Sequence, residues 1–249
     1  MSTFTIIPAR GPATIDPGLA RRIALLLPAV GCLLALPAAG ILLAVEAAGP
    51  SSSRKLLAAV LAIATLAVLT GGLHLDGLAD TADGIGSRCP GPQALEIMRR
   101  SDVGPMGVAT LVLTLLIQIT AVAAISPRWL GAAALVTATV TSRAGAVLAT
   151  GAPAARAHGF GALIAQTTSR TARWLTAALL LVAVIGAAAA ARGPMLAVRG
   201  ASAVVCGLAV AAAMRWLACR RLGGMTGDVY GALIEISTAT VLLVAAMIG

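Results

Sequence analysis

Three aspartates and a histidine stand close together early in the chain, directly after an apolar run. Asp76, Asp80 and Asp83 are three of the nine acidic residues, and His74 is one of two histidines. If the helix of the apolar run continues through them, the aspartates fall at i, i+4 and i+7, within about 40° on one face. Crowded carboxylates repel one another unless a cation binds them, and oxygen ligands suit Mg²⁺, Mn²⁺ or Ca²⁺. We therefore predict that Asp76, Asp80 and Asp83 are metal ligands and catalytic residues and that His74 binds substrate, the alternative being a solvated acidic helix end.

A second polar motif, residues 96–107, precedes another apolar run and reads EIMRRSDVGPMG. Its two glycines allow a tight turn in which the backbone can approach a ligand. Arginines beside a carboxylate cluster suit a phosphate that a metal bridges, although an ordinary basic loop beside a membrane is the alternative. From this motif we assign Arg99, Arg100 and Ser101 to substrate binding and Asp102 to the metal.

A third region combines an arginine inside an apolar run with a polar loop that follows it. Arg143 lies within the run, where a charge is costly and implies a partner. Arg156 and His158 lie in the loop. We assign both arginines to substrate binding. His158 is a candidate base, with a metal or phosphate contact as alternatives, although a lone loop histidine often has no such role.

The fourth motif, residues 223–235, reads GGMTGDVYGALIE. A glycine-rich turn here opens a helix, and helix N-termini attract anions, so Gly224, Thr226 and Gly227 are candidate phosphate contacts. Asp228 and Glu235 are seven residues apart and share a face. Glu235 would lie nearly two turns into the membrane, where an acid is by default a functional candidate. We predict both acids as metal ligands and Glu235 also as catalytic; a hydrogen-bonded packing acid is the alternative for Glu235.

The composition indicates an integral membrane protein. The chain has 249 residues, of which 59% are hydrophobic and 11% charged, and its mean hydropathy is +0.97. A net charge of +9 would suggest a nucleic-acid partner in a soluble protein, but here the arginines punctuate apolar runs as loop charges do. The partner that the composition predicts is the lipid bilayer. The four cysteines form no CxxC pair, so we predict reduced, structural thiols.

We predict an all-α, polytopic helical bundle that forms a single domain over residues 1–249. Residues 1–22 form a polar lead-in. A secretory signal is the alternative for the N-terminus, but the apolar stretch that follows is too long, so we expect a first span kinked by Pro28 and Pro37. The seven predicted transmembrane helices are residues 23–45, 56–75, 106–125, 129–149, 174–191, 195–217 and 230–248.

The distribution of charge predicts the orientation of the chain. With seven spans, 13 of the 18 Lys and Arg residues fall on the side of the N-terminus and 5 on the other side. The positive-inside rule then places the N-terminus in the cytoplasm and the C-terminus outside, in a multi-pass protein of the plasma membrane. Seven of the nine acids fall on or near the same side. We therefore predict one active site at the cytoplasmic face.

Three of these motifs, residues 74–84, 98–107 and 223–235, together resemble the cobalamin synthase family, adenosylcobinamide-GDP ribazoletransferase. The resemblance runs from about Thr70 to Glu235, with the motifs in the family's order. It implies an integral, Mg²⁺-dependent membrane enzyme that joins adenosylcobinamide-GDP to α-ribazole, or to α-ribazole 5′-phosphate, and releases GMP. The family often reads Met-Lys-Asp-Ser-Arg where this chain reads MRRSD. The roles of Arg100 and Asp102 therefore stay open.

The chemistry predicted from the residues agrees with that reaction. An alcohol attacks a pyrophosphate and a nucleoside monophosphate leaves, so the protein must neutralise charge, align the attack and accept a proton. CDP-alcohol phosphotransferases are the first alternative, but their DGxxAR signature is missing, because Asp80-Thr81 stands where it has Ala-Arg. An ion transporter is the second, and its acids would lie nearer the midplane. A homo-oligomer is also open.

Overall fold

The computed structural model describes residues 14–49 and 51–248, and helices dominate these residues. The predicted all-α class is confirmed. The helices are α1 (Pro17–Leu25), α2 (Leu27–Ala47), α3 (Ser52–Leu69), α4 (Leu73–Gly86), α5 (Gly91–Ile97), α6 (Pro105–Ala124), α7 (Arg128–Ala149), α8 (Phe160–Ile164), α9 (Arg170–Arg192), α10 (Pro194–Leu222) and α11 (Gly227–Met247).

Seven of these helices are long and apolar enough to cross a bilayer, as predicted: α2, α3, α6, α7, α9, α10 and α11. The first predicted span is divided, because α1 ends at Leu25 and α2 begins at Leu27. Pro28 occupies the first turn of α2, where a proline costs no hydrogen bond, while Pro37 lies inside the helix.

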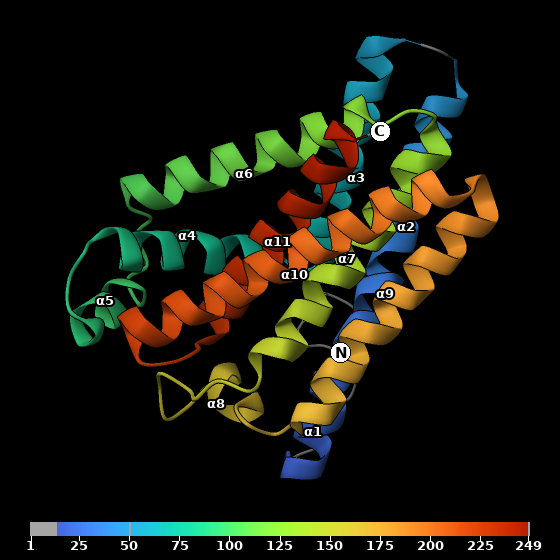
Figure 1. Cartoon of the computed structure of the whole chain (residues 1–249). Helices are drawn as coiled ribbons and strands as arrows, with labels where there is room; N and C mark the ends of the chain where they lie inside the picture. The colour runs from blue at the N-terminus through green and yellow to red at the C-terminus, as the bar shows by residue number, and fades with distance from the viewer. Residues whose placement is uncertain (1–13, 50, 249) are drawn as a thin grey trace.

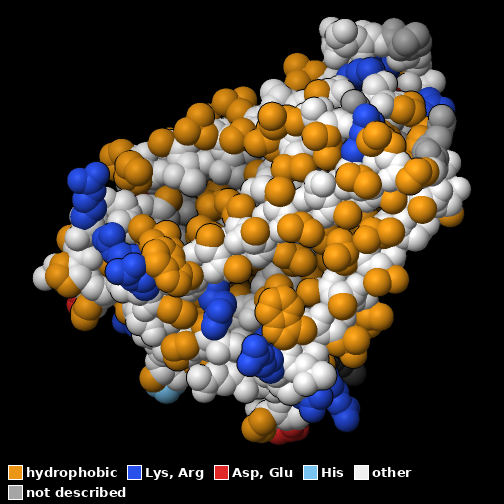
Figure 2. Space-filling view, viewed as in Figure 1, with side chains coloured by type: hydrophobic (Ala, Val, Ile, Leu, Met, Phe, Trp, Pro, Cys, Tyr) orange, Lys and Arg blue, Asp and Glu red, His pale blue; other side chains and the backbone are white. Residues whose placement is uncertain are grey.

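The connections sort to two ends of the bundle. Figure 1 shows the α2–α3, α6–α7 and α9–α10 connections at one end together with the C-terminal end of α11, and α1, α5 and α8 toward the other. Figure 2 shows Lys and Arg side chains at both ends of this face, with a band of hydrophobic and uncharged side chains between them. Such a band is what a helical bundle presents to lipid.

α7 and α11 form the centre of the bundle, and most of their residues are buried. α9 lies at the edge, with only a small share of its residues buried. Small residues allow the central helices to pack closely; at Gly31 of α2, for example, an added Cβ would lie 2.7 Å from the carbonyl oxygen of Thr139 on α7. Of the two, α11 carries the acids of the C-terminal motif, Asp228 and Glu235.

The helix of the second span does not continue into the aspartate motif, contrary to the prediction. α3 ends at Leu69, and Gly71 and Gly72 follow with φ values of 60° and 72°, which favour glycine. The chain then starts a separate helix, α4, which turns away from α3 and lies beside α6 and α11 (Figure 1). The two glycines therefore determine where the aspartates lie.

Candidate active site

α4 carries all three aspartates of the first motif at the predicted helical spacing. Asp80 is half-buried, and burial together with the negative charges of Asp76, Asp228 and Asp83 raises its pKa from 3.8 to about 6, while Arg156 opposes the rise. Like charges that lie this close favour protonation unless a cation is bound. Acids from both α4 and α11 therefore contribute to one negatively charged region around Asp80.

Glycines bring these two helices into backbone contact. An added Cβ at Gly77 of α4 would lie 2.6 Å from the carbonyl oxygen of Asp228, and one at Gly231 of α11 would lie 3.1 Å from the Cα of His74. Side chains at either position would separate the helices, because backbone atoms cannot move aside as flexible side chains can. The close crossing holds Asp228 beside the aspartates of α4.

The loop before α8 and the loop before α11 are joined by a short parallel bridge. The N–H of Ala155 donates to the carbonyl of Met225 at 3.0 Å, and the N–H of Met225 donates to the carbonyl of Pro153 at 2.9 Å. Gly224, predicted to contact substrate, instead lies buried against the backbone of residues 153–155. Its role is to let the two loops approach.

Arg156 connects this bridge to two helices. Its Nη1 donates to Oδ2 of Asp228 at 3.0 Å, and its Nη2 donates to the carbonyl of Leu95 on α5 at 3.1 Å. Its Nε is buried and has no hydrogen-bond partner among the described residues. The guanidinium thus neutralises part of the acidic cluster and leaves one buried N–H without a partner among the described residues.

A cavity of about 270 Å³ opens beside Asp228. Six predicted site residues line it: His74, Arg156, His158, Thr226, Gly227 and Asp228. Thr226 caps α11, accepting from the N–H of Val229 at 3.2 Å, so the positive end of a 21-residue helix borders the cavity. Tyr230 also lines it, and its buried hydroxyl has no partner among the described residues.

Asp83 has a different environment from its neighbours on α4. Its Oδ2 accepts from the N–H of Gly104 at 2.7 Å, and its Oδ1 accepts from the N–H of Gly107 at 2.8 Å. Both donors belong to the N-terminus of α6. Because each oxygen already accepts a backbone hydrogen bond, Asp83 caps α6 and holds it against α4.

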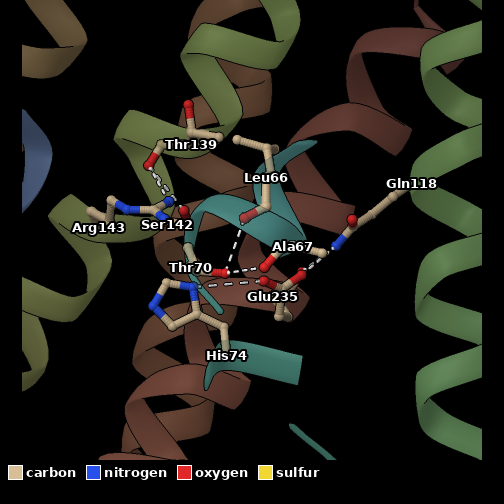
Figure 3. A network of polar contacts seen from close by, with 9 residues as sticks. All are labelled: Leu66, Ala67, Thr70, His74, Gln118, Thr139, Ser142, Arg143 and Glu235. Atoms are coloured by element: carbon tan, nitrogen blue, oxygen red, sulfur yellow. Dashed lines mark hydrogen bonds and ion pairs between the residues drawn. The ribbon is translucent and has the colours of Figure 1, made fainter. Parts of the chain in front are cut away.

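Glu235 lies in a separate polar network inside the bundle (Figure 3). Gln118 of α6 donates through Nε2 to Oε2 of Glu235 at 2.8 Å, and the side chain of Glu235 is only 16% exposed. His74 Nδ1 lies 3.8 Å from Oε1, which is too long for a hydrogen bond. Burial and the charge of Arg143 lower the pKa of His74 from 6.5 to about 3, so this imidazole is neutral at pH 7.

Arg143 is buried on α7, at the edge of the same network. Its Nη1 donates to the carbonyl of Thr139, one turn earlier, at 3.1 Å (Figure 3). It lines a small cavity with His74, Gln118 and Glu235 rather than the cavity beside Asp228. The charged partner expected for an arginine inside a span is thus Glu235, which interacts with Arg143 electrostatically. Substrate contact by Arg143 stays a prediction.

The predicted metal ligands are not assembled as one set. Within residues 14–49 and 51–248, no three His, Cys, Asp or Glu side chains meet closely enough to hold one ion. Glu235 has the partners given above, and Asp102 is exposed in the turn before α6. Arg99, Arg100 and Ser101 are exposed in the same turn. Asp76, Asp80 and Asp228 form the acidic group that remains.

Sequence reasoning missed Gln118, Tyr230 and the α5 backbone. Gln118 is the only strongly polar residue in the apolar run of α6, and a polar residue inside a span is a signal that could have been used. Tyr230 stood inside the fourth motif without a role. The contribution of Leu95 is a backbone carbonyl, for which its side chain gives no signal.

Two comparisons with known proteins find the same family. The family model described as cobalamin-5-phosphate synthase matches residues 1–246. An adenosylcobinamide-GDP ribazoletransferase of Frankia casuarinae is 42% identical over 258 residues, which cover 98% of this chain and 91% of that protein. The enzyme of the same name from Bradyrhizobium diazoefficiens is 35% identical over 247 residues, covering 98% and 90%. No solved structure matches.

Proposed function

The chain belongs to the cobalamin-5-phosphate synthase family, and we propose that the cavity between α4 and α11 is where it performs its transfer reaction. The activity is that of an adenosylcobinamide-GDP ribazoletransferase, which joins adenosylcobinamide-GDP to α-ribazole in late cobalamin biosynthesis. The observation that carries the assignment to this cavity is the convergence of Asp76, Asp80 and Asp228 with Arg156 at the α4–α11 crossing.

The reaction is a phosphoryl-type transfer to an alcohol. A ribazole hydroxyl attacks the phosphorus that stays with cobinamide, the bond from that phosphorus to the bridging oxygen breaks, and GMP leaves with the oxygen. The hydroxyl proton passes to a base. Such reactions require alignment and charge neutralisation more than covalent participation by the protein.

Positive groups around the cavity fit the pyrophosphate of the substrate. The N-terminus of α11, with Thr226 and Gly227, presents a helix end that favours anions. Arg156 has an unpaired Nε, and Tyr230 has an unpaired hydroxyl, among the described residues. These donors bind and orient the phosphates, and they stabilise the charge that develops on the leaving GMP.

A divalent cation, Mg²⁺ by the chemistry of the donors, fits the acidic group beside the cavity, of which Asp228 lines the cavity itself. Mg²⁺ is commonly held by one or two carboxylates with substrate phosphates and water completing its shell, so it does not require three protein ligands at one point. Asp76, Asp80 and Asp228 would hold it. When bound, it would supply charge neutralisation to the pyrophosphate and relieve the repulsion that raises the pKa of Asp80.

Two groups are suited to accept the proton of the ribazole hydroxyl. His158 is exposed and lines the cavity, and an imidazole nitrogen is a common general base in proton transfer. Asp80, with its pKa raised to about 6, is the alternative. The carboxylates of Glu235 and Asp83 already accept hydrogen bonds from Gln118 and from the α6 backbone, which argues against either as the base.

The cavity faces the cytoplasm in this proposal, and the chain lies in the plasma membrane. The support is the excess of Lys and Arg in the N-terminal region and in the connections that form this end of the bundle. A reporter fused after Gly249 should then read as outside the cytoplasm. A cytoplasmic signal from this reporter would contradict the proposed orientation of the chain.

The test of the proposed site is turnover in reconstituted membranes. GMP release from adenosylcobinamide-GDP with α-ribazole is measured for the parent, Asp228→Asn and Glu46→Gln. Asp228→Asn should lose at least about a hundred-fold in kcat, as loss of a charge-stabilising group does. Glu46 lies in the last turn of α2, at the opposite end of that helix from Leu27, which lines the cavity, and its variant should be unchanged. Equal rates for the parent and Asp228→Asn would reject the site.

A further inference from the structure

A second cavity, of about 340 Å³, lies between α7, α9 and α10. It is bordered by Arg170 and Arg173 at the start of α9 and by Arg215 near the end of α10, so it lies at the same end of the bundle as the acidic site. Trp174 and small or aliphatic residues of α7 and α10 complete the lining. None of the residues that assemble the acidic cavity takes part in it.

Small residues create the space. An added Cβ at Gly145 of α7 would lie 2.6 Å from the Cβ of Ala211 on α10, so the two helices touch at this point. The neighbouring lining positions, Ala149 and Ala212, carry only a methyl group. The long side chains come from the helix ends, and their charged groups therefore converge on a cavity that small residues leave open.

The cavity has three positive charges and no acidic residue in its lining. Arg173 Nη1 donates to the carbonyl of Thr168 at 2.5 Å, and its guanidinium lies against Gly151. The Nε of Arg215 is buried and has no hydrogen-bond partner among the described residues. Neither Arg170 nor Arg215 forms an ion pair within the described part of the chain. Such a group of arginines repels unless an anion lies among them.

The surroundings indicate that the cavity lies at the level of lipid head groups. Trp174 is 61% exposed, and Trp216, one residue after Arg215, is 57% exposed. The guanidinium of Arg220 stacks on the ring of Trp216, 4.8 Å from its centroid. Exposed tryptophans beside arginines at helix ends are typical of the membrane–water interface. Figure 2 shows Lys and Arg side chains at the borders of the uncharged band.

We propose that this cavity binds the phosphate of an anionic phospholipid head group. The guanidinium forks of Arg173 and Arg215 match phosphate oxygens, while the exposed Trp174 contacts the lipid next to the head group. The acyl chains lie along the outer surface of α9 and α10, which is largely exposed and apolar. The shared chemistry is that of a phosphate anion, and free phosphate is the competing source.

The test uses the full chain, purified in a neutral detergent. Native mass spectrometry counts retained phosphatidylglycerol during titration, with phosphatidylcholine and inorganic phosphate as the other arms. The parent should retain phosphatidylglycerol in preference to phosphatidylcholine. Arg215→Gln and Arg173→Gln should each weaken retention about five-fold, the effect of one arginine near an anionic lipid. Arg220→Gln, which removes the same charge five residues beyond Arg215 and outside the cavity, should leave it unchanged.

Three outcomes would overturn the proposal. Equal retention by the parent and both cavity variants, or equal loss in Arg220→Gln, would mean that the lipid binds by general attraction. Displacement of phosphatidylglycerol by inorganic phosphate at equal concentration would identify free phosphate as the occupant.

Arg215→Lys keeps the charge and should retain most binding. Turnover of each variant in detergent reports whether it has folded, because these arginines lie outside the acidic cavity.

Discussion

Asp83 on α4 accepts a hydrogen bond from the backbone N–H of Gly104, at 2.7 Å, and so caps the helix that follows the polar turn. A second bond, from Gly107, occupies its other oxygen. An added side chain at either glycine would collide with the carboxylate, so these positions must be glycine for Asp83 to approach the backbone. The first two motifs are thus joined through the carboxylate of Asp83, and in the proposed site Asp76, Asp80 and Asp228 are the acids that would act on the substrate and cation.

Asp83→Asn should therefore lower the unfolding free energy and leave the Mg²⁺ midpoint of turnover nearly unchanged. The amide keeps one acceptor but loses the charge at the N-terminus of α6, which should cost about 1 kcal/mol of unfolding free energy. Thermal unfolding in detergent measures the loss, and a Mg²⁺ titration of turnover gives the metal midpoint. A shifted midpoint with unchanged stability would instead identify Asp83 as a ligand, as its place in the motif predicts.

Asp80→Asn should abolish turnover and stabilise the metal-free protein at pH 7. The pKa of Asp80 is raised from 3.8 to about 6, so the folded chain binds this proton more tightly than the unfolded chain. The unfolding free energy of the parent then falls as the pH rises from about 4 to about 6 and stays low above that range. Because Asp80 is partly exposed, we expect about 1 kcal/mol or less.

The measurement is unfolding of the parent and Asp80→Asn without divalent cations at pH 4 and pH 7. The stability difference between the two proteins should be present at pH 7 and absent at pH 4. Addition of Mg²⁺ at pH 7 should stabilise the parent and leave the variant nearly unchanged. A variant that is less stable than the parent at pH 7 would contradict the assigned electrostatic strain.

Gly77→Ala should disrupt the site by separating α4 from α11. The new methyl would lie 2.6 Å from the carbonyl oxygen of Asp228, and backbone atoms cannot yield cheaply. Overpacking of this kind costs about 1–3 kcal/mol, and turnover should fall with it. Gly186→Ala on α9 is the control, because no atom lies within 4 Å of its added Cβ. Normal kcat in Gly77→Ala would mean that the crossing does not position the acids.

The helical class and the seven spans could be predicted because length and apolar composition alone decide whether a helix crosses a bilayer. The sequence also placed Arg156, His158 and Asp228 among the site residues, and these three line one cavity. The direction of α4 could not be predicted from periodicity, because the positive φ values of Gly71 and Gly72 interrupt the helix between α3 and α4. The hydrogen bond to Glu235 could not be predicted from the face of α11, because its donor, Gln118, comes from another helix.

Glu235→Gln tests whether that buried acid belongs to the chemistry or to the packing. Its carboxylate accepts a hydrogen bond from Gln118 at 2.8 Å and lies close to His74 and Arg143, away from the Asp228 cavity. Replacing it removes the negative charge that faces a buried arginine, so we expect a loss of about 1–3 kcal/mol in unfolding free energy. The Mg²⁺ midpoint of turnover should stay that of the parent.

A double-mutant cycle with Gln118→Leu assigns the loss to this pair. If the two side chains stabilise the bundle through their hydrogen bond, the double variant should be more stable than the sum of the single losses predicts, by about 0.5–2 kcal/mol. Thermal unfolding of the four proteins gives this coupling, and the Mg²⁺ titration is repeated on each. Additive losses together with a higher Mg²⁺ midpoint in Glu235→Gln would return Glu235 to the metal site, since the acid would then act on the cation rather than on Gln118.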